Sequence, residues 1–207
     1  LAGARTAYFC VGGPAEVRDG GIHAEQHLFT KMETPDPIVE KRLLRMISQF
    51  DTIITMGTRA VDFFRNKGID TDFHIVSGGI DTMRFRANEE PKLFDLIMTG
   101  RLVRIKRIDV FLQAVCLIMK ELPGVSAVIV GDGMLREQLQ RLACDLGIDR
   151  NVSFVGHQND VENWLKRSKI FVLTSDSEGL SLSMMEAMMS GLPAIVSDVG
   201  DLGDLVE

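Results

Sequence analysis

Residues 96–130 read LIMTGRLVRIKRIDVFLQAVCLIMKELPGVSAVIV, and the expected fold follows from this stretch. A short apolar run, 96–99, begins it, and a second apolar run, 126–130, ends it. Between the two runs, residues 109–122 place apolar side chains at helical spacing. A strand, a helix and a strand in this order predict two parallel strands joined by a right-handed crossover.

The same alternation continues beyond residue 130. Helices are expected over 135–146, 161–166 and 183–190, and strands over 152–155, 170–173 and 194–196. Gly147 follows the first of these helices, where a left-handed cap is expected. Apolar strands separated by helices predict an α/β fold with a doubly wound, parallel sheet, and ligands of such sheets bind beyond the carboxyl ends of the strands.

The first 80 residues are less regular. Strands are expected over 6–11, 52–55 and 75–76, and helices over 38–47 and 60–66. The polar segment that follows contains Pro91 and is predicted to link two domains.

Composition narrows the class of protein. The chain has 207 residues, of which 45% are hydrophobic and 25% charged, as in ordinary globular proteins. Its net charge of −6 argues against nucleic acid as a partner. The three cysteines are far apart, which favours free thiols in a reducing, cytoplasmic compartment. The sequence shows no membrane span or leader, and both of its ends look cut, so we expect a fragment of a longer protein.

Residues 177–186, SEGLSLSMME, carry Glu178 and Glu186. Gly179 and Leu180 predict a turn before a buried helix, which leaves backbone N–H groups at the positive helix end. A nucleotide diphosphate sugar needs such donors for its phosphates and carboxylates for its hydroxyl groups. The alternative is a capping box formed by Ser183 and Glu186, with Glu178 as an ordinary loop carboxylate.

Residues 100–106, GRLVRIK, follow the strand at 96–99. Arg101 offers a planar fork and Lys106 a point charge, and both suit a diphosphate. The alternative is a solvated basic turn.

The two motifs resemble the donor site of retaining glycosyltransferases of family 4, which have the GT-B fold. In that family, the arginine and lysine that match Arg101 and Lys106 clamp the donor pyrophosphate. The glutamate that matches Glu178 approaches the donor sugar, and the one that matches Glu186 holds the ribose. Arg107 is a departure, because the family often has glycine after the lysine.

The resemblance implies further donor-binding residues. Gly131 and Gly133 would line the donor pocket, although they equally suit a tight turn. His157 would contact the nucleotide base, unless it is an ordinary surface histidine. The helix N–H groups near Gly179 and Leu180 would stabilise the charge of the leaving diphosphate.

The N-terminal part would face the acceptor. Glu16 and His23 are the candidates for acceptor contacts, near glycine pairs that equally suit an adaptable loop. Lys41, Arg42 and Arg45 form a basic face of the helix at 38–47. That face is either solvated or in peripheral contact with a membrane.

The resemblance implies a domain order. Residues 1–82 would end the N-terminal, acceptor-side α/β domain, 83–92 would be the linker, and 93–207 would be a truncated, Rossmann-like donor-binding domain.

The resemblance also implies an activity. The enzyme would be a retaining, metal-independent glycosyltransferase of polysaccharide biosynthesis, cytoplasmic or at the inner face of the membrane. It would move a sugar from a UDP- or GDP-linked donor to the hydroxyl group of a saccharide or lipid-linked acceptor, without a cofactor. The 207 residues alone are expected to be catalytically silent.

Two other classes remain open. One is a nucleotide-sugar epimerase of GT-B-like fold, which would need further acid–base carboxylates in its cleft. The other is a non-catalytic nucleotide-binding module, which the absence of a third glycine after Gly133 disfavours, because Arg136 stands there. A metal site at Asp176 and Glu178 is not expected, because the family resembled generally needs no metal.

Overall fold

The computed structural model describes residues 5–10 and 37–205, which form two compact units. The first unit contains the described residues of Leu1–Gly78, Ser177–Leu180 and Asp198–Glu207. The second unit contains Gly79–Asp176 and Ser181–Ser197. The domain boundaries expected from the sequence stay a prediction.

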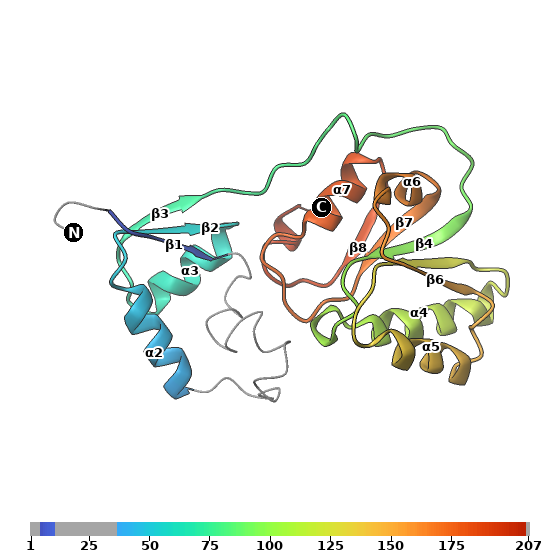
Figure 1. Ribbon diagram of the computed structural model, residues 1–207, viewed down its shortest axis with the longest axis horizontal. Coiled ribbons are helices and arrows are strands. Elements are labelled where there is room, and N and C mark those ends of the chain that lie inside the picture. The colour runs from blue at the N-terminus through green and yellow to red at the C-terminus, as the bar shows by residue number, and fades with distance from the viewer. Residues whose placement is uncertain (1–4, 11–36, 206–207) are drawn as a thin grey trace. The chain divides into compact units, whose positions relative to one another are not determined.

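The first unit contains a sheet of three parallel strands in the order β1-β2-β3 (Figure 1). The strands are β1 (Ala7–Cys10), β2 (Thr52–Thr55) and β3 (Asp72–Ile75), and the helices are α2 (Pro37–Ile47) and α3 (Thr58–Asn66). The third strand lies earlier than the expected 75–76, because β3 pairs along its whole length with β2, from Thr52↔Asp72 to Thr55↔Ile75.

Aliphatic and aromatic side chains share the core of this unit. The Phe64 side chain is fully buried, and its ring stacks on that of Phe73 at a centroid distance of 6.3 Å. The ring of Tyr8 meets Phe64 edge-on. Helix α3 therefore packs through Phe64 on side chains from β1 and β3, which fixes the helix against the sheet.

The second unit contains a sheet of five parallel strands in the order β6-β5-β4-β7-β8. The strands are β4 (Phe94–Thr99), β5 (Ala127–Val130), β6 (Val152–Gly156), β7 (Ser168–Leu173) and β8 (Ala194–Val196). Every residue of β5 is buried, as expected of an inner parallel strand that is covered on both faces. The parallel, doubly wound sheet predicted from the sequence is confirmed.

Helices cover both faces of the five-stranded sheet (Figure 1). They are α4 (Ile108–Glu121), α5 (Arg136–Asp145), α6 (Val161–Lys166) and α7 (Leu182–Met189). Figure 1 shows α4 and α5 on one face and α6 and α7 on the other. Phe111 and Leu112 lie on the buried stripe of α4, and each side chain contributes roughly 1.5–3 kcal/mol by its burial.

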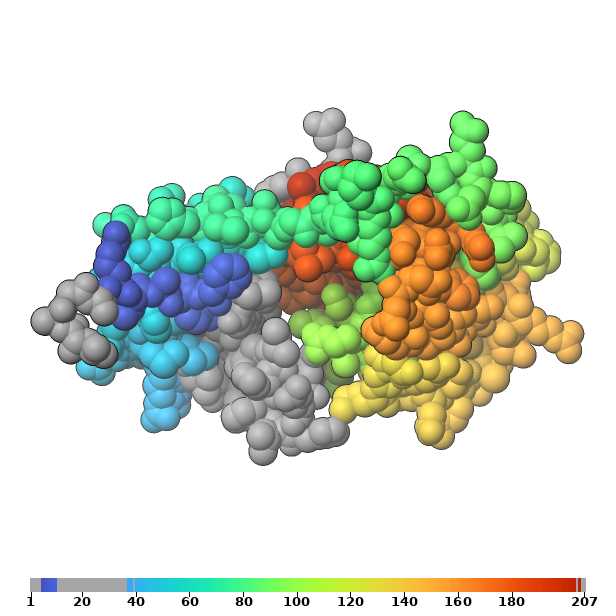
Figure 2. Space-filling view, turned by 45° about the horizontal axis from the view of Figure 1, so that its top comes forward, coloured from blue at the N-terminus to red at the C-terminus, as the bar shows by residue number. Residues whose placement is uncertain are grey.

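The segment 79–93, which contains a turn at 82–85, runs over the second unit beside α6 (Figure 2). The Lys92 ammonium donates to the backbone oxygen of Lys166 at 2.7 Å, and Glu90 pairs with Arg167 at 3.5 Å. The backbone N–H of Leu93 also donates to the Arg167 oxygen at 2.7 Å. The segment predicted as a linker is thus held along the second unit before β4 begins.

Candidate functional site

The order of the strands in the second unit places a topological switch point at the carboxyl end of β4. From β4 the chain builds outward through β5 to β6, and it then returns to the opposite side of β4 as β7. Loops leave neighbouring strands in opposite directions at such a switch point, which opens a ligand site. The loop 100–107 follows β4, and residues 174–176 follow β7.

Arg101 and Lys106 both line a small, shallow hollow beyond β4. The hollow is lined by Met98, Gly100, Arg101, Leu102, Lys106, Ile108 and Ile129. The Lys106 side chain runs back over the strand end, since a Cβ on Gly100 would lie 3.9 Å from Lys106 Cε. Two cations on one short loop at this edge of the sheet can attract a diphosphate.

Arg107 has an unusual backbone conformation. Its φ of 46° and ψ of 46° are left-handed, and it is the one residue other than glycine with positive φ in the described part of the chain. This conformation costs roughly 1–2 kcal/mol for a residue with a Cβ atom. It lies between the 3₁₀ turn Arg104–Lys106 and the first residue of α4.

Ion pairs surround the Arg107 guanidinium. Its Nε and Nη2 donate to the two carboxylate oxygens of Asp109 at 3.1 Å each, and its Nη1 donates to Asp176 Oδ1 at 2.9 Å. Hydrogen bonding to Asp109, followed by that to Asp176, raises the pKa of Arg107 above its usual value. The guanidinium therefore joins the start of α4 to the segment after β7.

Backbone contacts join the same two segments. The Thr174 hydroxyl donates to the Arg107 oxygen at 2.7 Å and to the Lys106 oxygen at 3.2 Å. The Asp176 N–H donates to the Ile105 oxygen at 2.8 Å. The turn that carries Lys106 is thus fixed to the end of β7.

Gly131 and Gly133 allow the loop after β5 to contact the loop after β4. A Cβ on Gly131 would lie 1.8 Å from the Gly100 oxygen, and one on Gly133 would lie 2.6 Å from the Leu102 oxygen. Only glycine permits backbone approach this close. This packing explains both glycines, and their contact with a donor stays a prediction.

Arg136 lies where a dinucleotide motif would have its third glycine. Its guanidinium donates to Asp132 Oδ2 at 2.8 Å and to the Phe154 oxygen at 3.2 Å, which bridges the ends of β5 and β6. The pKa of Asp132 is lowered, first by the N–H of Gly133 and then by Arg136 and His157. His157 is exposed at this edge of the sheet, and its contact with a base stays a prediction.

Glu186 does not close the helix N-terminus. The N-cap of α7 is Ser181, whose hydroxyl accepts from the Met184 N–H at 3.4 Å. The alternative of a capping box with Ser183 is therefore wrong, because the helix begins two residues earlier than that box requires. Glu186 lies within α7, and capping cannot explain it.

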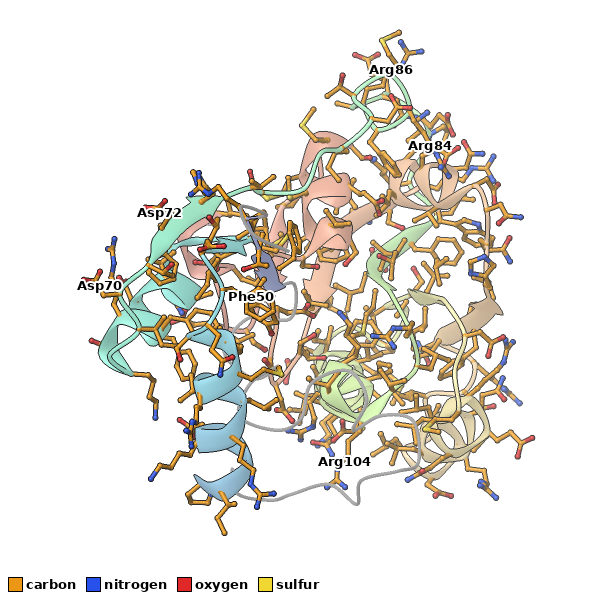
Figure 3. The ribbon with its side chains drawn as sticks, turned by 60° about the vertical axis from the view of Figure 1, so that its left-hand side comes forward. Phe50, Asp70, Asp72, Arg84, Arg86 and Arg104 are labelled. Carbon is orange, nitrogen blue, oxygen red and sulfur yellow. The ribbon has the colours of Figure 1, made fainter. Side chains whose placement is uncertain are left out.

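Arg84 and Glu162 act on Glu186. Arg84 lies beside α6 (Figure 3), where its Nε donates to Glu162 Oε2 at 2.7 Å. Burial raises the pKa of Glu186, the positive charge of Arg84 opposes that rise, and Glu162 adds to it. Glu186 is thus a half-buried carboxylate whose charged form is disfavoured by burial and by Glu162 and favoured by Arg84.

Glu178, Gly179 and Leu180 belong to the first unit. The Asp201 N–H donates to the Gly179 oxygen at 3.1 Å, and a Cβ on Gly200 would lie 2.0 Å from the Glu178 oxygen. The residues 200–201 therefore pack directly on the backbone that carries Glu178.

The acceptor-side candidates Glu16 and His23 lie outside the described residues. Lys41, Arg42 and Arg45 are exposed on α2, and membrane contact through them stays a prediction. Across residues 5–10 and 37–205, no helix is long and apolar enough to cross a membrane. The same residues contain no group of three side chains suited to a metal ion.

Sequence reasoning missed Arg107 and Arg136 as parts of this edge. Arg107 stands where the family often has glycine after the lysine, and Arg136 stands where a dinucleotide motif has its third glycine. These two departures from the motifs were the only signals in the sequence. The roles of Arg84 and Asp176 as ion-pair partners could not be predicted, because their partners are distant in the sequence.

Comparison with known proteins places the chain in a family. Residues 79–207 match the family described as Glycosyl transferases group 1. Over 117 residues, the chain is 37% identical to an Escherichia coli UDP-Gal:alpha-D-GlcNAc-diphosphoundecaprenol alpha-1,3-galactosyltransferase, which covers 55% of this chain and 30% of the relative. The chain spans 14–49% of the length of the similar curated proteins.

Two solved structures share the fold. A mutant of Staphylococcus aureus TarM in complex with UDP superposes with a TM-score of 0.80 at 21% identity, over 100% of this chain and 39% of TarM. The pneumococcal O-GlcNAc transferase GtfA, in complex with UDP and GlcNAc, gives a TM-score of 0.76 at 23% identity, over 99% of this chain and 40% of GtfA. The predicted GT-B class of fold is confirmed. With its matched region covering the whole five-stranded sheet and the hollow beside β4, the chain belongs to the group 1 glycosyl transferases.

Proposed function

We propose that this chain is the donor-binding part of a retaining, metal-independent glycosyltransferase of family 4, which acts in polysaccharide biosynthesis. Its donor is a nucleotide diphosphate sugar linked to UDP or GDP, and its acceptor is a hydroxyl group of a saccharide or a lipid-linked saccharide. The observation that carries the proposal is the position of Arg101 and Lys106, which line one hollow at the switch point of the sheet. Family membership favours this reading over an epimerase or a non-catalytic module.

The cations have the first role in this proposal. Negative charge develops on the diphosphate as the sugar leaves, and Arg101 and Lys106 stabilise that charge. Both side chains are placed before the reaction by the loop after β4, so little reorganisation is needed when the charge appears.

The glutamates have the second role. Glu186 accepts hydrogen bonds from the ribose hydroxyl groups, each contributing roughly 1.5–3 kcal/mol when the carboxylate is charged. Glu178 orients the donor sugar so that the acceptor attacks from the face that the diphosphate leaves.

A thermal-shift panel tests the donor class. UDP, GDP, ADP and NAD are each added to the chain and to its Lys106→Met variant, which keeps the aliphatic stem and removes the charge. A ligand at a hundred times its dissociation constant adds roughly 2.7 kcal/mol of stability, which raises the melting temperature by a few degrees. We expect a shift with UDP or GDP that is reduced in Lys106→Met.

Arg104→Ala is the matched control. Arg104 is exposed in the same 3₁₀ turn as Lys106, so this variant removes one positive charge from the same loop. An equal loss of the thermal shift in the two variants would show that the net charge of the loop, and not Lys106 itself, determines binding. A thermal shift with NAD alone would overturn the proposed donor class.

A further inference from the structure

Arg107 holds together three segments of the second unit. Its fork binds both oxygens of Asp109 in the first turn of α4, and its remaining amino group binds Asp176 after β7. A bidentate arginine pair fixes direction as well as distance, because the guanidinium and the carboxylate must be coplanar.

The side chain of Arg107 explains why a residue other than glycine occupies this strained position. Glycine would adopt a φ of 46° without cost, but glycine has no side chain to reach Asp109 and Asp176. Non-glycine residues in this region persist when their surroundings hold them there, and they gather at functional sites. Here the surroundings are the ion pairs and the hydrogen bond from Thr174 to the Arg107 oxygen.

The ion pairs of Arg107 bear on the proposed donor site through Lys106, the preceding residue. Lys106 precedes Arg107 directly, and its backbone oxygen is also held by Thr174. Its side chain lines the hollow beside β4 and runs over Gly100. We therefore expect a change of the backbone conformation at Arg107 to move Lys106, its direct neighbour.

We propose that Arg107 is a positioning residue for the donor diphosphate: by binding Asp109 and Asp176 at once, it sets the direction of Lys106 at the switch point of the sheet. The inference rests on the proposed function, since it assigns Lys106 a diphosphate to bind. It adds a residue that the family motif does not supply, because glycine is usual at this position.

Arg107→Gly separates the side chain from the backbone. Glycine keeps the left-handed turn and even relieves its strain, so the variant is expected to fold. It removes every hydrogen bond from the Arg107 side chain to Asp109 and Asp176. Arg104→Ala again serves as the control, because Arg104 lies exposed in the same turn (Figure 3) and its loss removes the same charge.

Hydrogen exchange measures whether the loop after β4 stays bound to the segment after β7. The Asp176 amide donates to the Ile105 oxygen, so its exchange rate reports whether the two loops stay together. We expect faster exchange of this amide in Arg107→Gly, with the amides of β4 and β5 unchanged. Unchanged exchange at Asp176 would overturn the inference, whatever the binding data show.

Ligand binding measures the consequence. We expect the dissociation constant of UDP to rise about tenfold in Arg107→Gly, and that of uridine to change by less than about twofold. GDP and guanosine form the second pair of probes. A variant that merely loosened the fold would weaken the nucleoside and the diphosphate alike, and that result would also overturn the inference.

A double variant tests whether Arg107 acts through Lys106. In the Lys106→Met background, Arg107→Gly is expected to cause no further loss of diphosphate affinity. Additive losses would show that Arg107 acts on its own, against the inference. If the unaltered chain binds neither UDP nor GDP, both the proposed function and the role of Arg107 are wrong. If the unaltered chain binds one of them and Arg107→Gly binds it equally well, only the role of Arg107 is wrong.

Discussion

The carboxylate of Asp201 accepts a hydrogen bond from the backbone N–H of Arg59 at 2.8 Å, although 142 residues separate the two in sequence. Arg59 lies in the first turn of α3, whose N-cap is Gly57, a residue without a side chain to offer. Asp201 is only 5% exposed, and it also accepts from the Thr58 hydroxyl at 3.3 Å. Asp201 therefore caps α3 from a distant part of the chain.

Asp201→Ala is expected to weaken α3. Loss of an N-cap acceptor costs about 1–2 kcal/mol, and the negative charge at the positive helix end is lost with it. The effect should appear as faster hydrogen exchange of the amides in α3, because that measurement follows the local opening of this helix. Unchanged protection of the Arg59 amide would show that the hydrogen bond contributes nothing.

Gly57→Ser supplies the matched control. A Cβ on Gly57 would lie 2.1 Å from Asp201 Cγ, so the serine alone should also destabilise the first unit. In the Asp201→Ala background the space is free, and the serine can cap the helix locally. We expect the double variant to recover most of the protection that each single variant loses.

Gly131→Ala is expected to be among the most damaging single changes in the second unit. The new methyl group would lie 1.8 Å from the Gly100 oxygen, and φ at this position is +144°, which residues with a Cβ atom rarely adopt. Strain and overpacking together should cost about 3 kcal/mol or more, measured by urea unfolding.

Gly124→Ala is the comparison for Gly131→Ala. No atom lies within 4 Å of a Cβ on Gly124, so this change should alter the free energy of unfolding by less than about 0.5 kcal/mol. Similar effects in the two variants would contradict the packing argument.

Much of the fold could be predicted because its signals are local. The strand at 126–130 is a continuous apolar run, and in the structure β5 is buried at every residue. Gly147 adopts the left-handed φ of +70° expected of a helix cap. Each of these features depends on residues that are neighbours in the sequence.

The rest depends on partners that are distant in sequence. Ser181 and Ser183 suit a cap equally by pattern, and only the start of the helix selects Ser181. Arg107 is a poor candidate for a left-handed turn until Asp176 is seen beside it, 69 residues away. Of the site, Arg101 and Lys106 could be predicted together because they share one short loop, whereas the neighbours of Glu186 could not.

Asp95 ties the beginnings of three strands together. Its carboxylate accepts from the Ser126 N–H at 2.9 Å and from the Lys169 ammonium at 2.7 Å. The Lys169 hydrogen bond first, and the Ser126 N–H next, lower the pKa of Asp95 below its ordinary 3.8.

Asp95→Asn should therefore reduce stability in a pH-dependent way. A lowered pKa in the folded state gives stability that is present above pH 3.8 and lost as the pH falls through the folded value. We expect the variant to unfold at a lower urea concentration than the unaltered chain at pH 7, with the difference shrinking below pH 3.8. A difference that stays constant with pH would assign the loss to packing instead of charge.

Glu186 should make nucleoside binding sensitive to weak acid. Burial raises its pKa above the ordinary 4.5, so the carboxylate becomes protonated at a higher pH than an exposed glutamate would. Uridine carries the ribose without a diphosphate whose own titration would overlap. We expect uridine affinity to fall as the pH decreases through this raised pKa, and to be weaker but independent of pH over that range in Glu186→Gln.

The stability of Glu186→Gln should change in the opposite sense to its binding. A raised pKa in the folded state means that the protonated form is favoured on folding, a contribution fully present below pH 4.5 and lost as the pH rises through the folded value. Glutamine imitates the protonated form, so the variant should melt at a higher temperature than the unaltered chain at pH 7, and at the same temperature below pH 4.5. A variant that melts lower at pH 7 would show that the attraction of Arg84 outweighs burial, and Glu186 would then be a structural ion-pair partner and not a ribose acceptor.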